Sequence, residues 1–234
     1  MISTEIKYIA SLIKQYLGHK IKEFLYILKY GHLIRRKSIR QYLRDTSRAK
    51  LHIGGGPREL EGFLNTDVYG KVPINIAKKL PFEDNQFDLI YSSHVIEHIH
   101  KNEFKLFLRE SYRILKEDGM NIIATPSLES ISKFWYCNNK KDEIMIDIMK
   151  ERYSKHMTEN CFTSSQHINL MMRGFGHKYL YDHCLIEELG INAGYRTVEN
   201  IPNLEVPDEI LREYLNSKKP PRWNLITETF LLIK

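Results

Sequence analysis

Three consecutive glycines follow a short apolar segment, Leu51–Ile53, which reads as a buried strand. Glycines at the end of a strand let the backbone approach a ligand closely, because no Cβ intrudes. The run Gly54–Gly56 lacks the full Gly-x-Gly-x-x-Gly dinucleotide pattern, and no Gly-Lys-Ser/Thr follows it, which disfavours a phosphate-cradling P-loop. Taken alone, the run predicts either a tight turn or a ligand-binding loop.

An acidic residue, Asp67, ends the next predicted strand, Phe63–Asp67. In nucleotide-binding α/β folds this is the place where an adenosine ribose presents its hydroxyl groups. A carboxylate could accept both hydrogen bonds, although a helix cap or a surface acid would look the same in sequence. Together with the glycines, Asp67 favours ribose binding.

A third group with chemical potential is His94, Glu97 and His98, which match the H-x-x-E-H pattern of some zinc hydrolases. On a helix these positions share a face, so two imidazoles could bind zinc with Glu97 as a base. In the competing interpretation, Glu97 and His98 bond the backbone or each other, and only His94 faces the pocket. No third ligand stands out downstream, so we predict no metal.

Five motifs in order resemble the methyltransferase type 11 group of class I S-adenosylmethionine-dependent methyltransferases. They are the strand and glycine loop 51–56, the second strand 62–67, the segment Leu80–Asp88, the helix start Ser92–Ile99 and the segment Leu108–Gly119. A later segment, His177–Asp182 followed by Ala193–Tyr195, resembles the family more loosely. The resemblance is strong over residues 50–126 and loose over residues 175–234.

The resemblance implies S-adenosyl-L-methionine as cofactor and assigns residues to it. Gly54 and Gly56 would lie under its methionine part, Asp67 would hold its ribose, and Asn75 would lie near the adenine amino group. The predicted cofactor-binding residues are His52, Gly54, Gly55, Gly56, Asp67, Asn75, Leu80, Phe82, Ser92 and Ser93.

Within this set, Leu80 and Phe82 would flank the adenine, while Ser92, Ser93 and His94 would face the methyl group and the acceptor. His94 is the candidate general base, because an imidazole titrates near neutrality and the position follows a strand end. His177 and Tyr181 are weaker candidates for contact with the acceptor.

Two residues depart from the family pattern. Gly55 stands where relatives often have Cys, and His52 stands where many have Asn or an acid. Because of the second departure, an alternative function remains: a protein that binds the cofactor without transferring its methyl group. An RNA methyltransferase is a further alternative, but few aromatic residues interleave with the arginines of residues 35–48, which counts against stacking on bases.

Strands and helices alternate from residue 50 onward, which predicts an α/β fold with a mostly parallel sheet and helices on both faces. Strands are expected at 51–53, 63–67, 72–76, 87–93, 120–125, 196–201 and 226–233, and helices at 102–116 and 183–193. The family resemblance implies a Rossmann-like sheet of seven strands with the last one antiparallel. Residues 127–176 break the rhythm and read as an insertion that caps the strand ends, with a helix-like stretch at 143–153.

The 234-residue chain has an uneven charge. Residues 1–50 carry 12 Lys and Arg against 3 Asp and Glu, whereas the other residues carry 23 against 26. We therefore divide the chain into a basic helical arm, 1–48, and a methyltransferase domain, 49–234. Apolar residues recur at helical spacing over 4–30, so the arm either packs on the domain or lies on an anionic membrane surface.

No stretch is long and apolar enough for a transmembrane helix, and no secretory signal is apparent. The cysteines at 137, 161 and 184 form no Cys-x-x-Cys pair and indicate free thiols, so a cytoplasmic location is expected, peripheral at the inner membrane face if the arm binds lipid. The expected reaction is methyl transfer to a small-molecule or glycan acceptor, by analogy in surface polysaccharide biosynthesis.

Overall fold

The computed structural model describes residues 32–70, 72–136, 164–202, 205–218 and 227–234. Six strands form one mixed sheet in the order β2-β1-β3-β4-β6-β5. They are β1 (Lys50–Ile53), β2 (Leu64–Thr66), β3 (Phe87–Ser93), β4 (Leu115–Pro126), β5 (Thr197–Ile201) and β6 (Thr227–Ile233).

The first four strands run parallel to one another, and β6 is antiparallel to both of its neighbours, β4 and β5. This confirms the predicted Rossmann-like mixed sheet with an antiparallel last strand. The carboxyl ends of β1, β2 and β3 therefore meet at one edge of the sheet, where α/β folds of this kind bind ligands.

The predicted strand at 72–76 is wrong for the described residues, which leaves six strands instead of seven. Only an isolated parallel bridge between Asp67 and Pro73 forms there. Proline lacks the N–H that a ladder requires, so the segment cannot extend the sheet as a regular strand.

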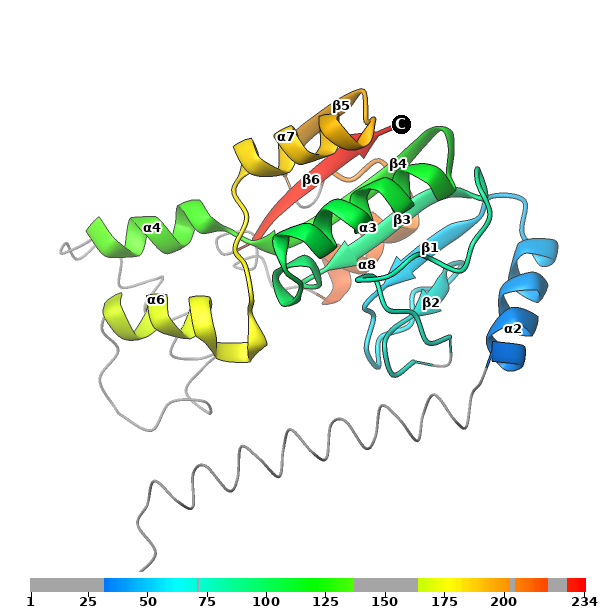
Figure 1. Ribbon diagram of the computed structural model, residues 1–234, viewed down its shortest axis with the longest axis horizontal. Helices are drawn as coiled ribbons and strands as arrows, with labels where there is room; N and C mark the ends of the chain where they lie inside the picture. The colour runs from blue at the N-terminus through cyan, green and yellow to red at the C-terminus, as the bar shows by residue number, and fades with distance from the viewer. Residues whose placement is uncertain (1–31, 71, 137–163, 203–204, 219–226) are drawn as a thin grey trace, which may run out of the picture.

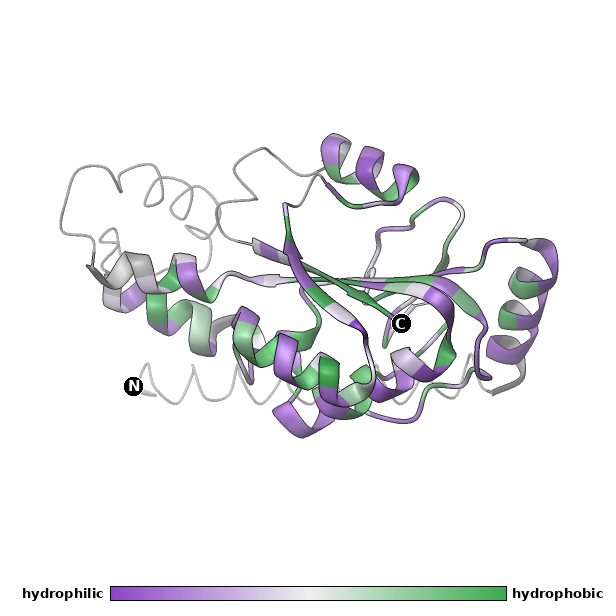
Figure 2. Ribbon diagram, turned by 90° about the horizontal axis from the view of Figure 1, so that it is seen from above, coloured by the Kyte–Doolittle hydropathy of each residue, from purple (hydrophilic) through white to green (hydrophobic). Residues whose placement is uncertain are grey.

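The described helices are α2 (His32–Asp45), α3 (Lys101–Ile114), α4 (Leu128–Tyr136), α6 (Ser164–Arg173), α7 (His183–Ala193) and α8 (Glu209–Lys218). Short 3-10 turns lie at η1 (Ile96–His98) and η4 (Gly174–Gly176). Helices α3 and α7 cover one face of the sheet and α8 covers the other (Figures 1 and 2).

Alternate residues along the strands supply two separate cores, because successive side chains point to opposite faces. On β3, Ile90 packs in the core under α3 and α7, while Leu89 and Tyr91 pack in the core under α8. The apolar side chains of α3, among them Phe104, Phe107 and Leu108, fill the first core. The amphipathic pattern predicted for 102–116 is thus realised.

The end of α3 differs from its prediction. The helix ends at Ile114, and Leu115 already has extended backbone, so β4 begins before the predicted stop at Asp118-Gly119. Asp118 has a φ of 57°, and a Cβ on Gly119 would lie 2.7 Å from the carbonyl oxygen of Lys116. These two residues therefore form a tight turn within β4 and do not cap the helix.

The prediction for 183–193 is confirmed residue by residue. Asp182 caps α7 by accepting a hydrogen bond from the Leu185 N–H at 2.8 Å, and Gly194 ends the helix with a φ of 113°. A left-handed C-cap of this kind favours glycine because it has no Cβ.

In the described part of the arm, α2 packs on the domain. Ile39 is buried in the core, and the Tyr42 hydroxyl lies 2.9 Å and 2.8 Å from the carbonyl oxygens of Lys50 and Gly62, which share its one proton. The helix predicted over 4–30 lies outside the described residues, as does the stretch 143–153. Among the described residues, no helix is both long and apolar enough to span a bilayer.

A buried polar network ties α3, β4 and the start of β5 together. The Tyr195 hydroxyl donates to Ser111 Oγ at 3.0 Å, and Asn121 Nδ2 donates to both of these oxygens, at 3.2 Å to Ser111 and 3.1 Å to Tyr195. Ser111 and Asn121 are fully buried, so no solvent can replace a lost partner.

We expect Tyr195→Phe to lower the free energy of unfolding by about 1–3 kcal/mol, because Ser111 and Asn121, which are fully buried, each lose their hydrogen bond with the Tyr195 hydroxyl. Urea unfolding followed by circular dichroism measures the change. Tyr179→Phe is the matched control, since Tyr179 is 36% exposed. Equal stability of the Tyr195→Phe protein would show that the network does not stabilise the fold.

Candidate functional site

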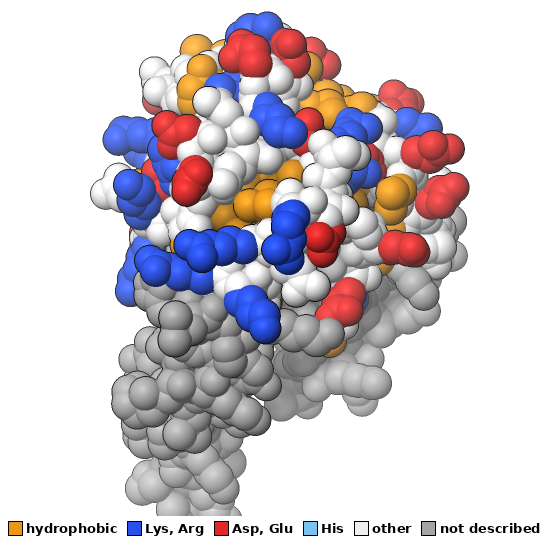
Figure 3. Space-filling view, turned by 90° about the vertical axis from the view of Figure 1, so that its right-hand side faces the viewer, with side chains coloured by type: hydrophobic (Ala, Val, Ile, Leu, Met, Phe, Trp, Pro, Cys, Tyr) orange, Lys and Arg blue, Asp and Glu red, His pale blue; other side chains and the backbone are white. Residues whose placement is uncertain are grey.

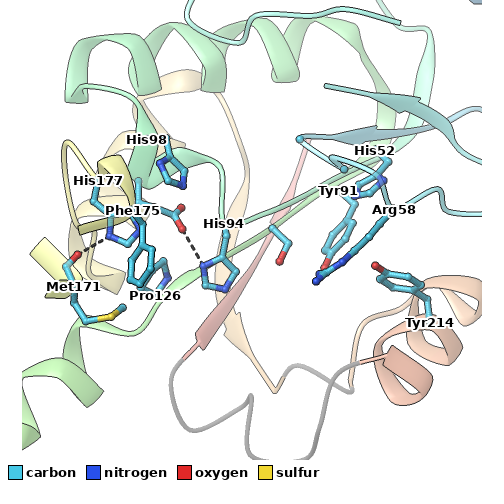
Figure 4. A pocket seen from close by; sticks show the side chains of 14 residues that line it. His52, Arg58, Tyr91, His94, His98, Pro126, Met171, Phe175, His177 and Tyr214 are labelled. Carbon is cyan, nitrogen blue, oxygen red and sulfur yellow. Dashed lines mark hydrogen bonds and ion pairs between the residues drawn. The ribbon is translucent and has the colours of Figure 1, made fainter. Parts of the chain in front are cut away.

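Two adjoining cavities lie at the carboxyl ends of β1, β2 and β3. The larger cavity, about 610 Å³, is lined mainly by the loop after β2 and the turn after β3. The smaller cavity, about 290 Å³, lies between the glycine loop, η1 and the segment 171–177 (Figure 4). Four residues line both: Gly54, His94, His98 and Phe175.

The glycine loop packs directly against the turn after β3. Gly54 has a φ of 70°, and a Cβ on it would lie 2.3 Å from Val95 Cγ2, so no other residue fits without moving that turn. The N–H groups of Gly54 and Gly55 both donate to the Thr66 carbonyl at the end of β2. The loop is therefore held between two strand ends, as ligand binding by its backbone requires.

Asp67 lines the larger cavity, and its predicted contact with a ribose stays a prediction. Its Oδ2 accepts the Gly56 N–H at 2.9 Å, and its Oδ1 accepts the Tyr69 N–H at 3.1 Å. Each carboxylate oxygen can accept a second hydrogen bond. Asp67 thus orders the glycine loop and keeps acceptor capacity for a pair of hydroxyl groups in the cavity.

Asn75 also lines the larger cavity. Its Oδ1 already accepts the Ala77 N–H at 2.9 Å in a local turn, and the side chain is exposed. The predicted contact of Asn75 with an adenine amino group stays a prediction, and its side-chain oxygen would be shared with the backbone.

Four predicted cofactor residues line neither cavity: Gly56, Leu80, Phe82 and Ser92. Leu80 and Phe82 are buried in the core, where Phe82 packs edge-on against Phe87 at 4.8 Å between ring centroids. Ser92 is 1% exposed on β3, whereas its neighbour Ser93 lines the smaller cavity. The alternation of side chains along a strand explains why only one of the two serines reaches the site.

His52 and Gly55 line the smaller cavity and not the larger one. The His52 Nδ1 lies 2.9 Å from Asn65 Oδ1, and its ring stacks on Tyr91 at 5.5 Å. A Cβ on Gly55 would lie 2.6 Å from the imidazole, so His52 supports the glycine loop from below. Gly56 lines neither of the two cavities.

His94 stands between the cavities with its side chain 28% exposed. Its backbone has a φ of 56°, and its N–H donates to the Ala124 carbonyl on β4. The Nδ1 atom lies 2.9 Å from Glu97 Oε1 (Figure 4), and Nε2 lies 3.3 Å from Thr227 Oγ1. A carboxylate only accepts hydrogen bonds, so in the neutral form of this imidazole Nδ1 carries the proton and Nε2 has the lone pair.

Glu97 is fully buried beneath His94. Burial alone would raise the pKa of the Glu97 carboxyl, but the hydrogen bond and charge of His94 outweigh it and lower that pKa below its usual value. The ionised carboxylate therefore fixes the imidazole orientation. The sequence analysis paired Glu97 with His98 or the backbone, but the structure pairs its side chain with His94.

The two weaker candidates for contact with the acceptor, His177 and Tyr181, lie in different environments. His177 lines the smaller cavity opposite His94, and its Nδ1 donates to the Met171 carbonyl (Figure 4). Tyr181 is wrong as an acceptor contact, because it is fully buried and its ring packs on Phe104 at 4.6 Å between centroids. The apolar side of α3 attracts the Tyr181 ring into the core.

Several lining residues were missed by the sequence analysis. Arg58, Tyr91 and Tyr214 line one end of the smaller cavity, while Met171 and Phe175 line the other (Figure 4). Tyr91 lies on a strand that was predicted, and its alternation with Ser93 could have shown that both point to one side. Tyr214 is on α8, far away in sequence, and no local pattern marks it.

The larger cavity has a carboxylate, Asp67, that could bind the hydroxyl groups of a ribose. The smaller cavity has the oriented imidazole of His94, and Gly54 and His94 line both cavities. Gly54 and Asp67, two residues that the resemblance assigns to S-adenosylmethionine, both line the larger cavity. The two cavities together could bring a methyl donor and an acceptor to the same place.

Comparison with known families gives one match. Residues 67–123 match the family model described as a methyltransferase domain. The matched segment runs from Asp67 through η1 and α3 into β4, so it contains His94 and Glu97. A search of curated proteins found no match to the chain.

Solved structures with a similar chain trace include a SAM-dependent methyltransferase from Archaeoglobus fulgidus, at 16% identity and a TM-score of 0.44, with 90% of this chain and 99% of that one covered. Another is a methyltransferase from Mesorhizobium loti, at 12% identity and a TM-score of 0.46, covering 82% and 95%. A third is phosphoethanolamine N-methyltransferase 2 from Haemonchus contortus, at 15% and 0.44, covering 91% and 57%.

All three TM-scores are below 0.5, so the family assignment depends on the sequence match. That match covers the second strand's acid, the turn with His94 and the amphipathic helix α3. The predicted resemblance is confirmed by this match: residues 67–123 are similar to a methyltransferase domain.

Proposed function

We propose that the protein transfers a methyl group from S-adenosylmethionine to a hydroxyl or amine of a small-molecule or glycan acceptor. The observation that carries this proposal is the His94–Glu97 pair at the junction of the two cavities. The cofactor supplies an electrophilic methyl group on its sulfonium. The chain's own residues bind it, orient the acceptor and accept the acceptor's proton.

In this proposal Asp67, Asn75 and the glycine loop hold the cofactor in the larger cavity. The acceptor occupies the smaller cavity, with its nucleophilic atom near His94 Nε2. Glu97 is a positioning residue, since it holds Nδ1 protonated and leaves the opposite nitrogen as the base. The Thr227 hydroxyl lies 3.3 Å from Nε2. This contact supports the proposal that an acceptor hydroxyl can approach the same nitrogen.

A glycan acceptor in surface polysaccharide synthesis is the finer part of the proposal and depends on analogy with relatives that share the motifs. The smaller cavity is lined by groups that suit a sugar: the aromatic residues Tyr91 and Tyr214, and the exposed cation Arg58. Screening sugars and glycans with methyl-labelled S-adenosylmethionine tests this. Transfer only to acceptors of another class would overturn the glycan assignment.

The direct test of the cofactor assignment uses Asp67→Ala, which removes charge-assisted hydrogen bonds of about 1.5–3 kcal/mol each. We expect the dissociation constant of S-adenosylhomocysteine to rise at least tenfold, as measured by titration calorimetry. Glu61→Ala, which removes an exposed acid near the same loop, is the control.

Asp67 also orders the glycine loop, so a second ligand separates the two effects. An S-adenosylhomocysteine analogue without the 2′-hydroxyl should bind the wild type more weakly than the parent compound. It should bind Asp67→Ala no more weakly than the parent does, because the shared bond is already lost. Additive losses would show that Asp67 acts only on the loop.

For the base, we expect His94→Gln to lower kcat by about 10²–10⁴-fold, the usual contribution of a positioned general base. Binding of S-adenosylhomocysteine should change little, because glutamine retains a hydrogen-bonding side chain of similar length. Glu97→Gln should lower kcat less, since its amide oxygen can still accept from His94. Turnover of His94→Gln at the wild-type rate is the result that rejects the base.

We further propose that the basic arm binds weakly to anionic lipid and so brings the protein to the inner membrane face. Helix α2 presents Arg36, Lys37 and Arg40 to solvent beside the packed Ile39. Figure 3 shows Lys and Arg side chains gathered on this side of the molecule.

Each basic residue near anionic lipid contributes about 1 kcal/mol. We therefore expect Arg36→Glu/Lys37→Glu/Arg40→Glu to abolish co-sedimentation with anionic liposomes at low salt. Neutral liposomes and high salt should release the wild type as well, because screening weakens exposed charges. Equal sedimentation of both proteins with anionic liposomes would contradict a role for α2.

A further inference from the structure

Three potential metal ligands meet on the wall of the smaller cavity. One ligand atom from each of Glu97, His98 and His177 lies within 4.8 Å of the others. All three residues line the cavity, and Figure 4 shows the His98 and His177 rings on the same side of it. The two rings are 5.0 Å apart and nearly perpendicular. Two imidazoles and a carboxylate are a ligand set that zinc uses.

The cluster joins segments that are far apart in the sequence. Glu97 and His98 belong to η1, and the N–H groups of Lys178 and Tyr179 both donate to the Glu97 carbonyl, at 2.7 and 3.3 Å. These backbone bonds fix His177 beside η1 without help from its side chain. The three ligands are therefore brought together by the fold before any ion binds.

Each histidine has one ring nitrogen occupied by the backbone. His177 Nδ1 donates to the Met171 carbonyl, which leaves Nε2 as the nitrogen with a lone pair. His98 makes a hydrogen bond to the backbone of Gly176. Metal-binding histidines usually donate their second N–H to a carbonyl or carboxylate in this way, which sets the tautomer and the ring orientation.

Glu97 can serve an ion and His94 at the same time. Its Oε1 is bonded to His94 Nδ1 at 2.9 Å, while Oε2 has a longer contact of 3.4 Å with Thr125 Oγ1. One carboxylate oxygen is thus already engaged, and the other retains most of its acceptor capacity. A cation beside a fully buried carboxylate would stabilise its negative charge, because a buried charge is unfavourable unless it is paired.

We propose that Glu97, His98 and His177 bind one Zn²⁺ ion on the wall of the smaller cavity, with an open coordination position toward the cavity. The sequence pattern H-x-x-E-H points to His94 and His98 as zinc ligands but offers no third ligand nearby in the chain, which is why the sequence alone predicts no metal. In the structure His94 is hydrogen-bonded to Glu97 and lies outside the cluster. The third ligand is His177, which follows His98 by 79 residues in the sequence.

Zinc is the best match in size and ligand preference. Tetrahedral zinc at about 2.0–2.1 Å from each ligand places ligand atoms about 3.3 Å apart, so the present separations must contract. Small rotations of the two imidazoles about their side-chain bonds provide this movement. Imidazole ligands also select zinc over magnesium and calcium, which prefer oxygen.

The test measures Zn²⁺ binding to the full chain without a histidine tag, after dialysis against a chelator. Titration calorimetry and elemental analysis should give one Zn²⁺ per chain. His98→Gln and His177→Gln should each weaken binding at least tenfold. His100→Asn is the matched control, because His100 is exposed, adjacent to η1 and outside the cluster, and asparagine keeps the helix cap.

Co²⁺ provides a readout on the unaltered protein in case a variant fails to fold. Binding at this site should give the visible bands of a tetrahedral ion with nitrogen and oxygen ligands and no thiolate charge-transfer band. Absence of stoichiometric Zn²⁺ in the wild type, a thiolate band, or equal affinity in folded histidine variants would each overturn the proposal. None of these readouts depends on methyl transfer, so they are independent of the proposed function.

Discussion

The close contact between Gly54 and Val95 is the constraint on which the site depends. Strands β1 and β3 are neighbours in the sheet, and their following turns meet where a Cβ on Gly54 would lie 2.3 Å from Val95 Cγ2. That contact permits only glycine, and it sets the distance between the glycine loop and His94. Because both turns are also bonded to neighbouring strands, at Thr66 and Ala124, the sheet register fixes the boundary between the two cavities.

Glu97 has a central position in this arrangement. Its side chain orients His94, its carbonyl oxygen holds the segment 178–179, and its buried carboxylate faces the neighbouring imidazoles. One short turn therefore connects the core of the domain with a segment that follows the inserted residues. A change at this position would disturb the base, the cavity wall and the path of the chain after α6 (Ser164–Arg173) together, which makes conservative substitutions such as Glu97→Gln more informative than deletion of the side chain.

Much of the sheet could be predicted because apolar strands with regular spacing carry their own signal. The glycine loop, Asp67 and His94 could be predicted because strand ends bring chemistry to one edge. Leu80, Phe82, Ser92 and Tyr181 were misplaced, since family motifs do not tell which side chains the core takes up. The prediction of a strand at 72–76 was wrong because Pro73 has no N–H to donate to a neighbouring strand. Arg58, Phe175 and Tyr214 reach the site through packing between distant segments, which no local pattern encodes.

The four residues common to both cavities, Gly54, His94, His98 and Phe175, have a consequence for the thermodynamics of ligand binding. Any effect that a ligand on one side of this shared wall has on the free energy of binding on the other side must, by linkage, be equal in both directions. Phe175, which is 40% exposed with a φ of 55°, is the part of that wall least restrained by packing. The dissociation constants of the two ligands should therefore be reported as a coupled pair, each measured at a stated saturation of the other.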